Sequence, residues 1–251
     1  MKRFLTIVAL AALTAVCARA QKVPAFDDWF VDKTMRVDYF HAGNSAEETI
    51  ALDQVFDQGI WAGSRTHLVD PFNLGRYLVK VYDAASGTLI FSKGFDSYFG
   101  EYKTSDPALQ GVRRTYHESA LLPYPRKPVR FTVEAKDRQN AYKDLFSQVI
   151  DPAATTVIRE RLVPGVKVFE VIKSGEPRRK VDVAIVAEGY TAEEEGKLKA
   201  DLDRFAAVFF KLEPYRSHRD KFNLYGVFKP SLESGCDEPS HASYKNTTVG
   251  A

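Results

Sequence analysis

Alternating apolar and polar residues dominate positions 34–150 of this chain, and this pattern predicts short β-strands. The clearest hairpin joins residues 77–82 to residues 88–93 through a turn that contains Gly87. Further strands are expected at residues 35–43, 112–122, 129–137 and 144–151, with a proline-rich turn at 123–128. Residues 45–59 are interpreted as a short helix or an irregular edge segment. Several short strands separated by turn residues predict a β-sandwich.

After about residue 151 the pattern changes from alternating strands to a strand, a helix and another strand. Strands are expected at 166–172 and 221–231, and the apolar run that starts at residue 181 predicts a strand buried on both faces. Thr191 and Glu194 form a capping box, so a helix begins there and ends before Pro214. Its apolar face is expected to carry Leu198, Leu202, Phe205, Phe209 and Leu212. This order is the start of an α/β unit.

One helix cannot cover both faces of a buried sheet. We therefore expect either that a partner covers the open face or that the natural polypeptide continues beyond Ala251. The predicted fold class is α+β and multidomain, with an antiparallel β-sandwich at 21–150 and an incomplete α/β domain at 151–251.

The first 20 residues have the features of a secretory signal peptide. A basic start at Lys2 and Arg3 precedes the apolar run 4–16 and an Ala-Arg-Ala cleavage site, so Gln21 is the expected mature N-terminus. The competing interpretation, lipidation at Cys17, is weaker because a bulky valine precedes that cysteine. We expect export to the periplasm or the extracellular space, without a membrane span.

The mature chain is nearly neutral. Loss of Lys2, Arg3 and Arg19 from the 35 basic residues leaves 32 against 33 acidic ones, a net charge of about −1. This balance argues against a polyanion-binding surface and predicts no nucleic-acid partner. Cys236 becomes the only cysteine, so no internal disulfide is expected.

The pair His117-Glu118 matches the first half of the zinc signature H-E-x-x-H. Position i+4 is Leu121, which cannot bind a metal, and Pro123 follows soon after. We predict a strand and no zinc site here. None of the other histidines, His41, His67, His218 and His241, has a second histidine four positions away.

Two other stretches contain chemically active side chains. A soft divalent metal could bind the cluster Cys236, Asp237, Glu238 and His241, but a polar loop is the favoured interpretation. Cys236 as a nucleophile would require a neighbouring base, and a passive thiol is favoured. Glu188 ends the strand in AEGYT, a stretch that lacks both phosphate-binding glycine signatures and predicts an ordinary strand-to-helix turn. No catalytic, cofactor-binding or metal-binding residue is assigned.

The stretches VDVAIVAEGYTAEEEGKLKADLDRFAAVFF and EPYRSHRDKFNLYGVFKPSLESGCDEPS, within residues 181–251, resemble the bacterial IgA-peptidase-type secreted zinc metallopeptidases. Residues 24–150, with YHES and LPYPRKPV, resemble the β-sandwich domain that precedes the catalytic domain in that family. The resemblance implies a zincin-like domain in which zinc activates water and a glutamate acts as base. The family's H-E-x-x-H helix and D-E-Y segment match nothing in residues 1–251. The resemblance therefore implies that this chain is the amino-terminal portion of a zinc metallopeptidase that acts on a protein or peptide. It also implies that residues 1–251 alone are inactive.

The alternative function is an exported, non-enzymatic module that binds a protein or a glycan. Its contacts would come from sandwich aromatics, although core packing is the favoured role of these residues: Tyr77, Tyr82, Tyr98, Phe99 and Tyr102. The sequence sets neither the substrate nor the oligomeric state.

Overall fold

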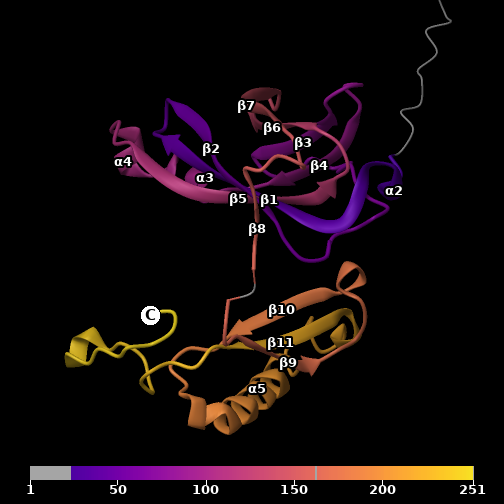
Figure 1. The fold of residues 1–251 in the computed structure, drawn as a ribbon. Helices are drawn as coiled ribbons and strands as arrows, with labels where there is room; N and C mark the ends of the chain where they lie inside the picture. Colours follow the sequence, from indigo (N-terminus) through magenta and orange to yellow (C-terminus); the bar gives the residue numbers. More distant parts are fainter. Residues whose placement is uncertain (1–23, 162, 251) are drawn as a thin grey trace, which may run out of the picture.

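The computed structural model describes residues 24–161 and 163–250, which form two units in succession (Figure 1). The first unit contains two four-stranded sheets, and the second contains a three-stranded sheet with one long helix. This architecture confirms the predicted α+β, multidomain class with an N-terminal β-sandwich.

The first sheet of the sandwich has the strand order β5-β1-β2-β8. Its strands are β1 (Phe30–Gly43), β2 (Glu48–Asp57), β5 (Arg114–Pro125) and β8 (Val157–Arg159), and the short helix α2 (Phe26–Trp29) precedes β1. The central strand β1 pairs antiparallel with both β2 and β5, whereas β8 runs parallel to β2. Because β8 pairs with β2, this sheet continues past residue 150. The exact domain boundary at 150/151 stays a prediction.

The second sheet of the sandwich is fully antiparallel, with the order β4-β3-β6-β7. Its strands are β3 (Tyr77–Asp83), β4 (Leu89–Phe95), β6 (Val129–Lys136) and β7 (Tyr142–Ile150). Two short helices, α3 (Tyr98–Tyr102) and α4 (Asp106–Leu109), connect β4 to β5. The predicted hairpin of β3 and β4 and the strands at β6 and β7 are confirmed.

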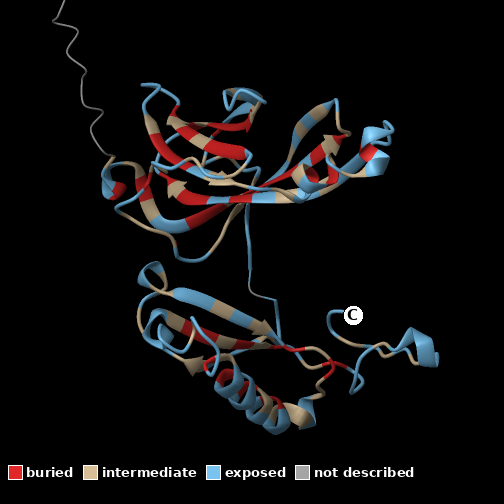
Figure 2. Cartoon of the chain, turned by 180° about the vertical axis from the view of Figure 1, so that it is seen from behind, coloured by how far each residue is buried: buried red, intermediate tan, exposed pale blue. Residues whose placement is uncertain are grey.

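Apolar side chains from both sheets form the core of the sandwich. Figure 2 marks buried residues along the strands of both sheets. Since side chains alternate along a strand, Phe131 and Val133 of β6 face the same side as Val129, and all three are buried. The most buried members of this core are Phe30, Met35, Val37, Tyr39, Leu68, Val81, Ile90, Leu122, Val129, Phe131 and Val133.

Two predictions within the sandwich are wrong. Residues 45–59 were expected to be a helix or an irregular edge, but most of them form β2, paired along β1. The Asn44 side chain accepts hydrogen bonds from the backbone N–H groups of Ala46 and Glu47, both at 2.9 Å, and this turn returns the chain alongside β1. The proline-rich turn is shorter than predicted because β5 continues to Pro125. Strand β5 is the outer strand of its sheet, a position that tolerates proline.

The second unit contains β9 (Lys167–Ile172), β10 (Val181–Val186), α5 (Glu195–Phe209) and β11 (Phe222–Phe228), with short 3₁₀ helices at Pro177–Arg179, Ala192–Glu194, Arg219–Lys221 and Pro239–His241. The sheet order is β10-β11-β9, with β10 parallel and β9 antiparallel to β11. The predicted strand–helix–strand order is confirmed, and so is the capping box of Thr191 and Glu194.

Helix α5 covers one face of this sheet, and β10 is an edge strand (Figure 1). The prediction that β10 is buried on both faces is therefore wrong: Val181 is 53% exposed and Val186 is 61% exposed.

The predicted apolar face of α5 is only partly correct. Leu198 and Leu202 are buried together with Ala206, but Phe205 is 45% exposed and Leu212 is 58% exposed. Helix α5 approaches β11 closely, since Leu202 occupies the space that a Cβ atom at Gly226 would need. This contact sets the rotation of the helix and turns Phe205 outward. No helix in the described part of the chain is long and apolar enough to cross a membrane.

Candidate functional site

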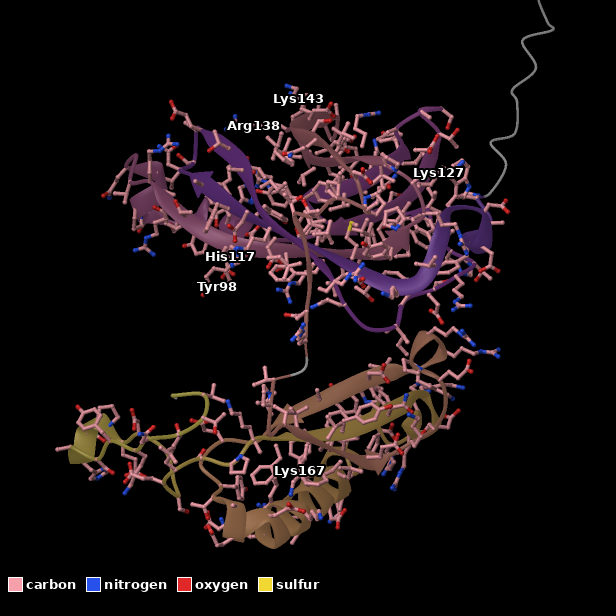
Figure 3. All side chains as sticks on the ribbon, in the orientation of Figure 1. Tyr98, His117, Lys127, Arg138, Lys143 and Lys167 are labelled. Atoms are coloured by element: carbon pink, nitrogen blue, oxygen red, sulfur yellow. The ribbon has the colours of Figure 1, made fainter. Side chains whose placement is uncertain are left out.

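His117 and Glu118 lie on opposite faces of β5, as expected for a strand. His117 is about half exposed, and its Nε2 lies 3.0 Å from Asp53 Oδ2 (Figure 3). The Glu118 side chain is turned inward, to His41. The two side chains therefore cannot share a metal, and the prediction of a strand in place of a zinc-binding helix is confirmed.

The inward side chain of Glu118 belongs to a buried ionic network centred on His41. His41 Nδ1 lies 3.0 Å from Glu118 Oε2, and His41 Nε2 lies 2.9 Å from Glu48 Oε1. Lys103 forms a second ion pair with Glu48, and the backbone N–H of Phe99 donates to Glu118 Oε1 at 3.1 Å. Because both ring nitrogens face carboxylates, the arrangement favours the imidazolium form of His41.

Protonation in this network follows from the competition between burial and pairing. Burial by itself would lower the pKa of His41, but hydrogen bonds and charges from Glu118 and Glu48 outweigh it and raise that pKa. Burial would raise the pKa of Glu48, yet hydrogen bonds from His41 and Lys103 lower it to about 2. Burial would also raise the pKa of Glu118, but hydrogen bonds from His41 and from the backbone N–H of Phe99, with the charge of His41, together lower it. The network is therefore held in its charged form near neutral pH.

Aromatic rings shield the His41 side chain from solvent. The His41 ring is stacked on Phe99 with centroids 4.1 Å apart, and Tyr77 meets it edge-on at 5.3 Å. His41 is only 1% exposed. A histidine that has both nitrogens occupied and no access to solvent cannot exchange protons with a substrate, so the network stabilises the fold.

From the sequence, His41 and Glu48 had no predicted role, and Glu118 was a candidate only together with His117. His41 and Glu48 are seven positions apart, on either side of the turn at Gly43-Asn44, and the alternation of side chains at the start of β2 was not recognised. Glu118 is 77 positions from His41, and only the pairing of β1 with β5 brings them together.

Beside this network lies an open cleft of about 1110 Å³. Glu48, Lys103 and Ser97 belong to its lining, together with the loop between β6 and β7. The charged lining residues are Arg76, Lys103, Lys136, Arg138 and Lys143, with Glu48, Asp96, Glu101 and Asp137. Mixed charges of this kind can hold a polar ligand, but none of them forms a nucleophile–base pair.

The aromatic contact candidates are mostly core residues. Tyr77, Phe99 and Tyr102 are buried, which confirms the packing role that was favoured for them. Tyr98 is 70% exposed, and its ring packs against Tyr116 with centroids 5.2 Å apart.

The polar cluster after β11 is a loop closed by its own hydrogen bonds. His241 Nδ1 lies 3.2 Å from Glu238 Oε2, and the backbone N–H of Lys245 donates to Asp237 Oδ1 at 2.6 Å. The Cys236 thiol is exposed and free. Within residues 24–161 and 163–250, no group of three or more His, Cys, Asp or Glu side chains is placed to hold a metal ion. The described residues therefore do not fit a zinc site.

Glu188 lies at the carboxyl end of β10, where sites often form in α/β sheets. Its carboxylate accepts hydrogen bonds from the Thr247 hydroxyl and, at 3.0 Å, from the backbone N–H of Val249. The next residue, Gly189, has φ +70° and contacts the backbone of Gly235 so closely that a side chain would not fit. The turn at Glu188-Gly189, predicted as an ordinary strand-to-helix turn, therefore also holds the segment that follows β11 in place.

Comparison with protein families assigns both units. Residues 25–147 match the family model described as the peptidase M64 N-terminus. Residues 169–251 match the model described as IgA peptidase M64. No curated protein matches the chain. The two matches follow the order of the sandwich and the α/β unit and together span most of the sequence, so the chain belongs to the IgA peptidase M64 family.

Proposed function

We propose that this chain supplies the N-terminal β-sandwich and the first α/β unit of an exported zinc metallopeptidase that hydrolyses peptide bonds in a protein or peptide. The observation that carries the proposal is the order of the two family matches, each on a separately folded unit. The zinc requirement and the reaction are inferences from the family.

In this proposal, residues 21–251 act as a scaffold. The 251 residues contain no H-E-x-x-H sequence, and the described residues include no metal-binding group of side chains. We therefore propose that the zinc ligands and the general base are not among these residues, and that this chain alone does not cleave peptides.

The test is a peptide-cleavage assay of the purified chain with added zinc, in the presence and absence of a chelator. We expect no cleavage under either condition. Hydrolysis that survives purification and disappears with the chelator would contradict the assignment of these residues as a scaffold. The intact mass and the C-terminal peptides of the native protein show whether an H-E-x-x-H segment accompanies them.

Export is proposed from the basic, apolar and small-residue regions of residues 1–20, which lie outside the described residues. Sequencing the N-terminus of the protein from the culture medium and the periplasm is the measurement. Gln21 as the first residue is expected, whereas a lipid-modified Cys17 would refute cleavage after Ala20.

The cleft of about 1110 Å³ in the sandwich favours a second candidate, a non-enzymatic exported module that binds a protein or a glycan. A glycan array and a protein pull-down with the whole chain are the tests. Enrichment that is lost in Arg138→Glu, a change in the cleft lining, would favour this role, and no enrichment in either experiment would count against it.

A further inference from the structure

Two segments that are far apart in the sequence meet at one end of the second unit. They are residues 173–180, which lead into β10, and residues 211–221, which lead into β11 (right side of Figure 1). Lys180 Nζ donates to the backbone oxygen of Asp220 at 2.6 Å, across 40 positions. Asn223 Oδ1 accepts the backbone N–H groups of Ser174 and Gly175 at 2.8 and 3.1 Å, which fixes the first segment to β11.

This end of the unit, here called the basic end, is strongly positive. Its acidic residues are Glu176, Glu213 and Asp220, and its basic residues are Lys173, Arg178, Arg179, Lys180, Lys211, Arg216, Arg219 and Lys221. Eight basic against three acidic residues give a net charge of +5, whereas the whole chain has a net charge of +2. The near-neutral total therefore conceals a local concentration of positive charge, which attracts anions.

A hollow of about 470 Å³ lies within the basic end. Three cationic side chains line it, Arg179, Lys180 and Lys221, with one acidic side chain, Glu176. That carboxylate is already paired with Arg178 at 2.6 Å. Arg179 forms no ion pair with any residue in the described part of the chain. Lys221 is paired with Asp220 at 2.8 Å, so Arg179 is the cation of the hollow that stands ready for an anionic group such as a phosphate.

Exposed apolar side chains lie within and just before the second segment, residues 211–221. Val208, in the last turn of α5, is 51% exposed, and Leu212, just after it, is 58% exposed. The backbone N–H of Arg216 donates to the Leu212 oxygen at 2.8 Å, so the apolar residues and the basic loop are continuous. Positive charge combined with exposed apolar residues is characteristic of surfaces that lie on a lipid bilayer.

We propose that the basic end binds the surface of an anionic lipid bilayer. Headgroup phosphates interact with Arg179, Lys221 and their neighbours around the hollow, while Val208 and Leu212 reach the boundary between headgroups and acyl chains. An acidic polypeptide would satisfy the charges, but it would leave the exposed apolar residues without a partner. The observations therefore favour the bilayer.

The experiment is co-sedimentation of the chain from Gln21 onward, the expected mature form, with two kinds of vesicle. One contains about one quarter phosphatidylglycerol in phosphatidylcholine, and the other is pure phosphatidylcholine. We expect binding to the first kind only, weakening as salt is added. The triple variant Arg178→Gln, Arg179→Gln, Lys221→Gln should bind about fivefold more weakly for each removed charge, roughly 100-fold in all.

A matched control removes three exposed or ion-paired cations from the sandwich, through Lys127→Gln, Arg138→Gln and Lys143→Gln (Figure 3). It should bind nearly as tightly as the parent. Leu212→Gln should weaken binding severalfold, whereas Leu109→Gln, which changes a leucine 66% exposed on the sandwich, should not.

Two results would overturn the proposal. The first is equal loss of binding in the two triple variants, or no loss in either. The second is binding to soluble polyglutamate as tight as to the anionic vesicles with no effect of Leu212→Gln, which would assign the basic end to an acidic polypeptide.

Discussion

The buried position of His41 predicts that replacing it destabilises the sandwich far more than replacing His117. His41→Leu leaves the carboxylates of Glu48 and Glu118, only 8% and 10% exposed, without the cation that bridges them. Removing one partner of a buried ion pair destabilises a protein by about 3–5 kcal/mol. His117 also pairs with a carboxylate at 3.0 Å, but its side chain is 49% exposed. Exposed pairs contribute about 0–1 kcal/mol, so His117→Leu is the matched control.

The assay is urea unfolding followed by tryptophan fluorescence. Both tryptophans of the chain, Trp29 and Trp61, belong to the sandwich or pack on its core, so the signal reports this unit. The free energy of unfolding at pH 6 should fall by about 3–5 kcal/mol in His41→Leu and by at most about 1 kcal/mol in His117→Leu. Equal losses in the two variants would refute the assignment of His41 as the centre of a buried charged network.

The pH dependence has a definite sign. The pKa of His41 is raised in the folded protein, so its stabilisation is complete below the ordinary histidine pKa and is lost as pH rises through the folded value. The pKa of Glu48 is lowered to about 2, so its stabilisation is present above the ordinary carboxyl pKa and is lost as pH falls toward about 2. The difference between wild type and His41→Leu should be largest between these limits and should shrink at alkaline pH. A difference that stays constant into the alkaline range would contradict a charged His41.

Three further predictions concern the second unit. Thr191→Ala removes the capping box and should destabilise α5 by about 1 kcal/mol, measured as the loss of helical circular dichroism on heating. Thr191→Ser keeps the hydroxyl and should retain the stability of α5. Gly226→Ala places a methyl group against Leu202 and should destabilise the unit by about 1–3 kcal/mol, whereas Gly196→Ala, where a Cβ meets nothing within 4 Å, should be neutral or stabilising. Cys236 should react fully with a thiol reagent without denaturant, because its thiol is exposed and free; slow labelling that urea accelerates would show that it is buried.

The predictable part of the fold came from local patterns. Alternation located β1, β3, β4, β6 and β7, since a strand with one buried face shows its period in the sequence. The capping box located the start of the helical segment, because the hydrogen bonds of a cap involve neighbouring residues only. Strand β2 was missed because its exposed residues alternate with residues that are only half-buried, so its sequence lacks the period of a strand with one buried face. Its position also depends on pairing with the partner strand β1.

The candidate site was less accessible to sequence analysis. His117-Glu118 drew attention as half of a zinc motif, and its strand character was predicted correctly. The partner that Glu118 uses is His41 on a neighbouring strand, and no local pattern encodes that pairing. The exposure of Phe205 likewise reflects the contact of Leu202 with Gly226, which determines how α5 rotates against the sheet, whereas Leu212 is exposed because α5 already ends at Phe209.

By itself, the sequence determined the fold class, the order of a sandwich followed by an α/β unit, and the resemblance to IgA-peptidase-type enzymes. These depend on periodicity and on short motifs, which are properties of neighbouring residues. Only the tertiary structure decided which charges meet. It buried His41 between two carboxylates from other strands, and it gathered the basic residues of two distant segments at one end of the α/β unit. Electrostatic interactions depend on distance in space, and folding brings together charges that the sequence separates.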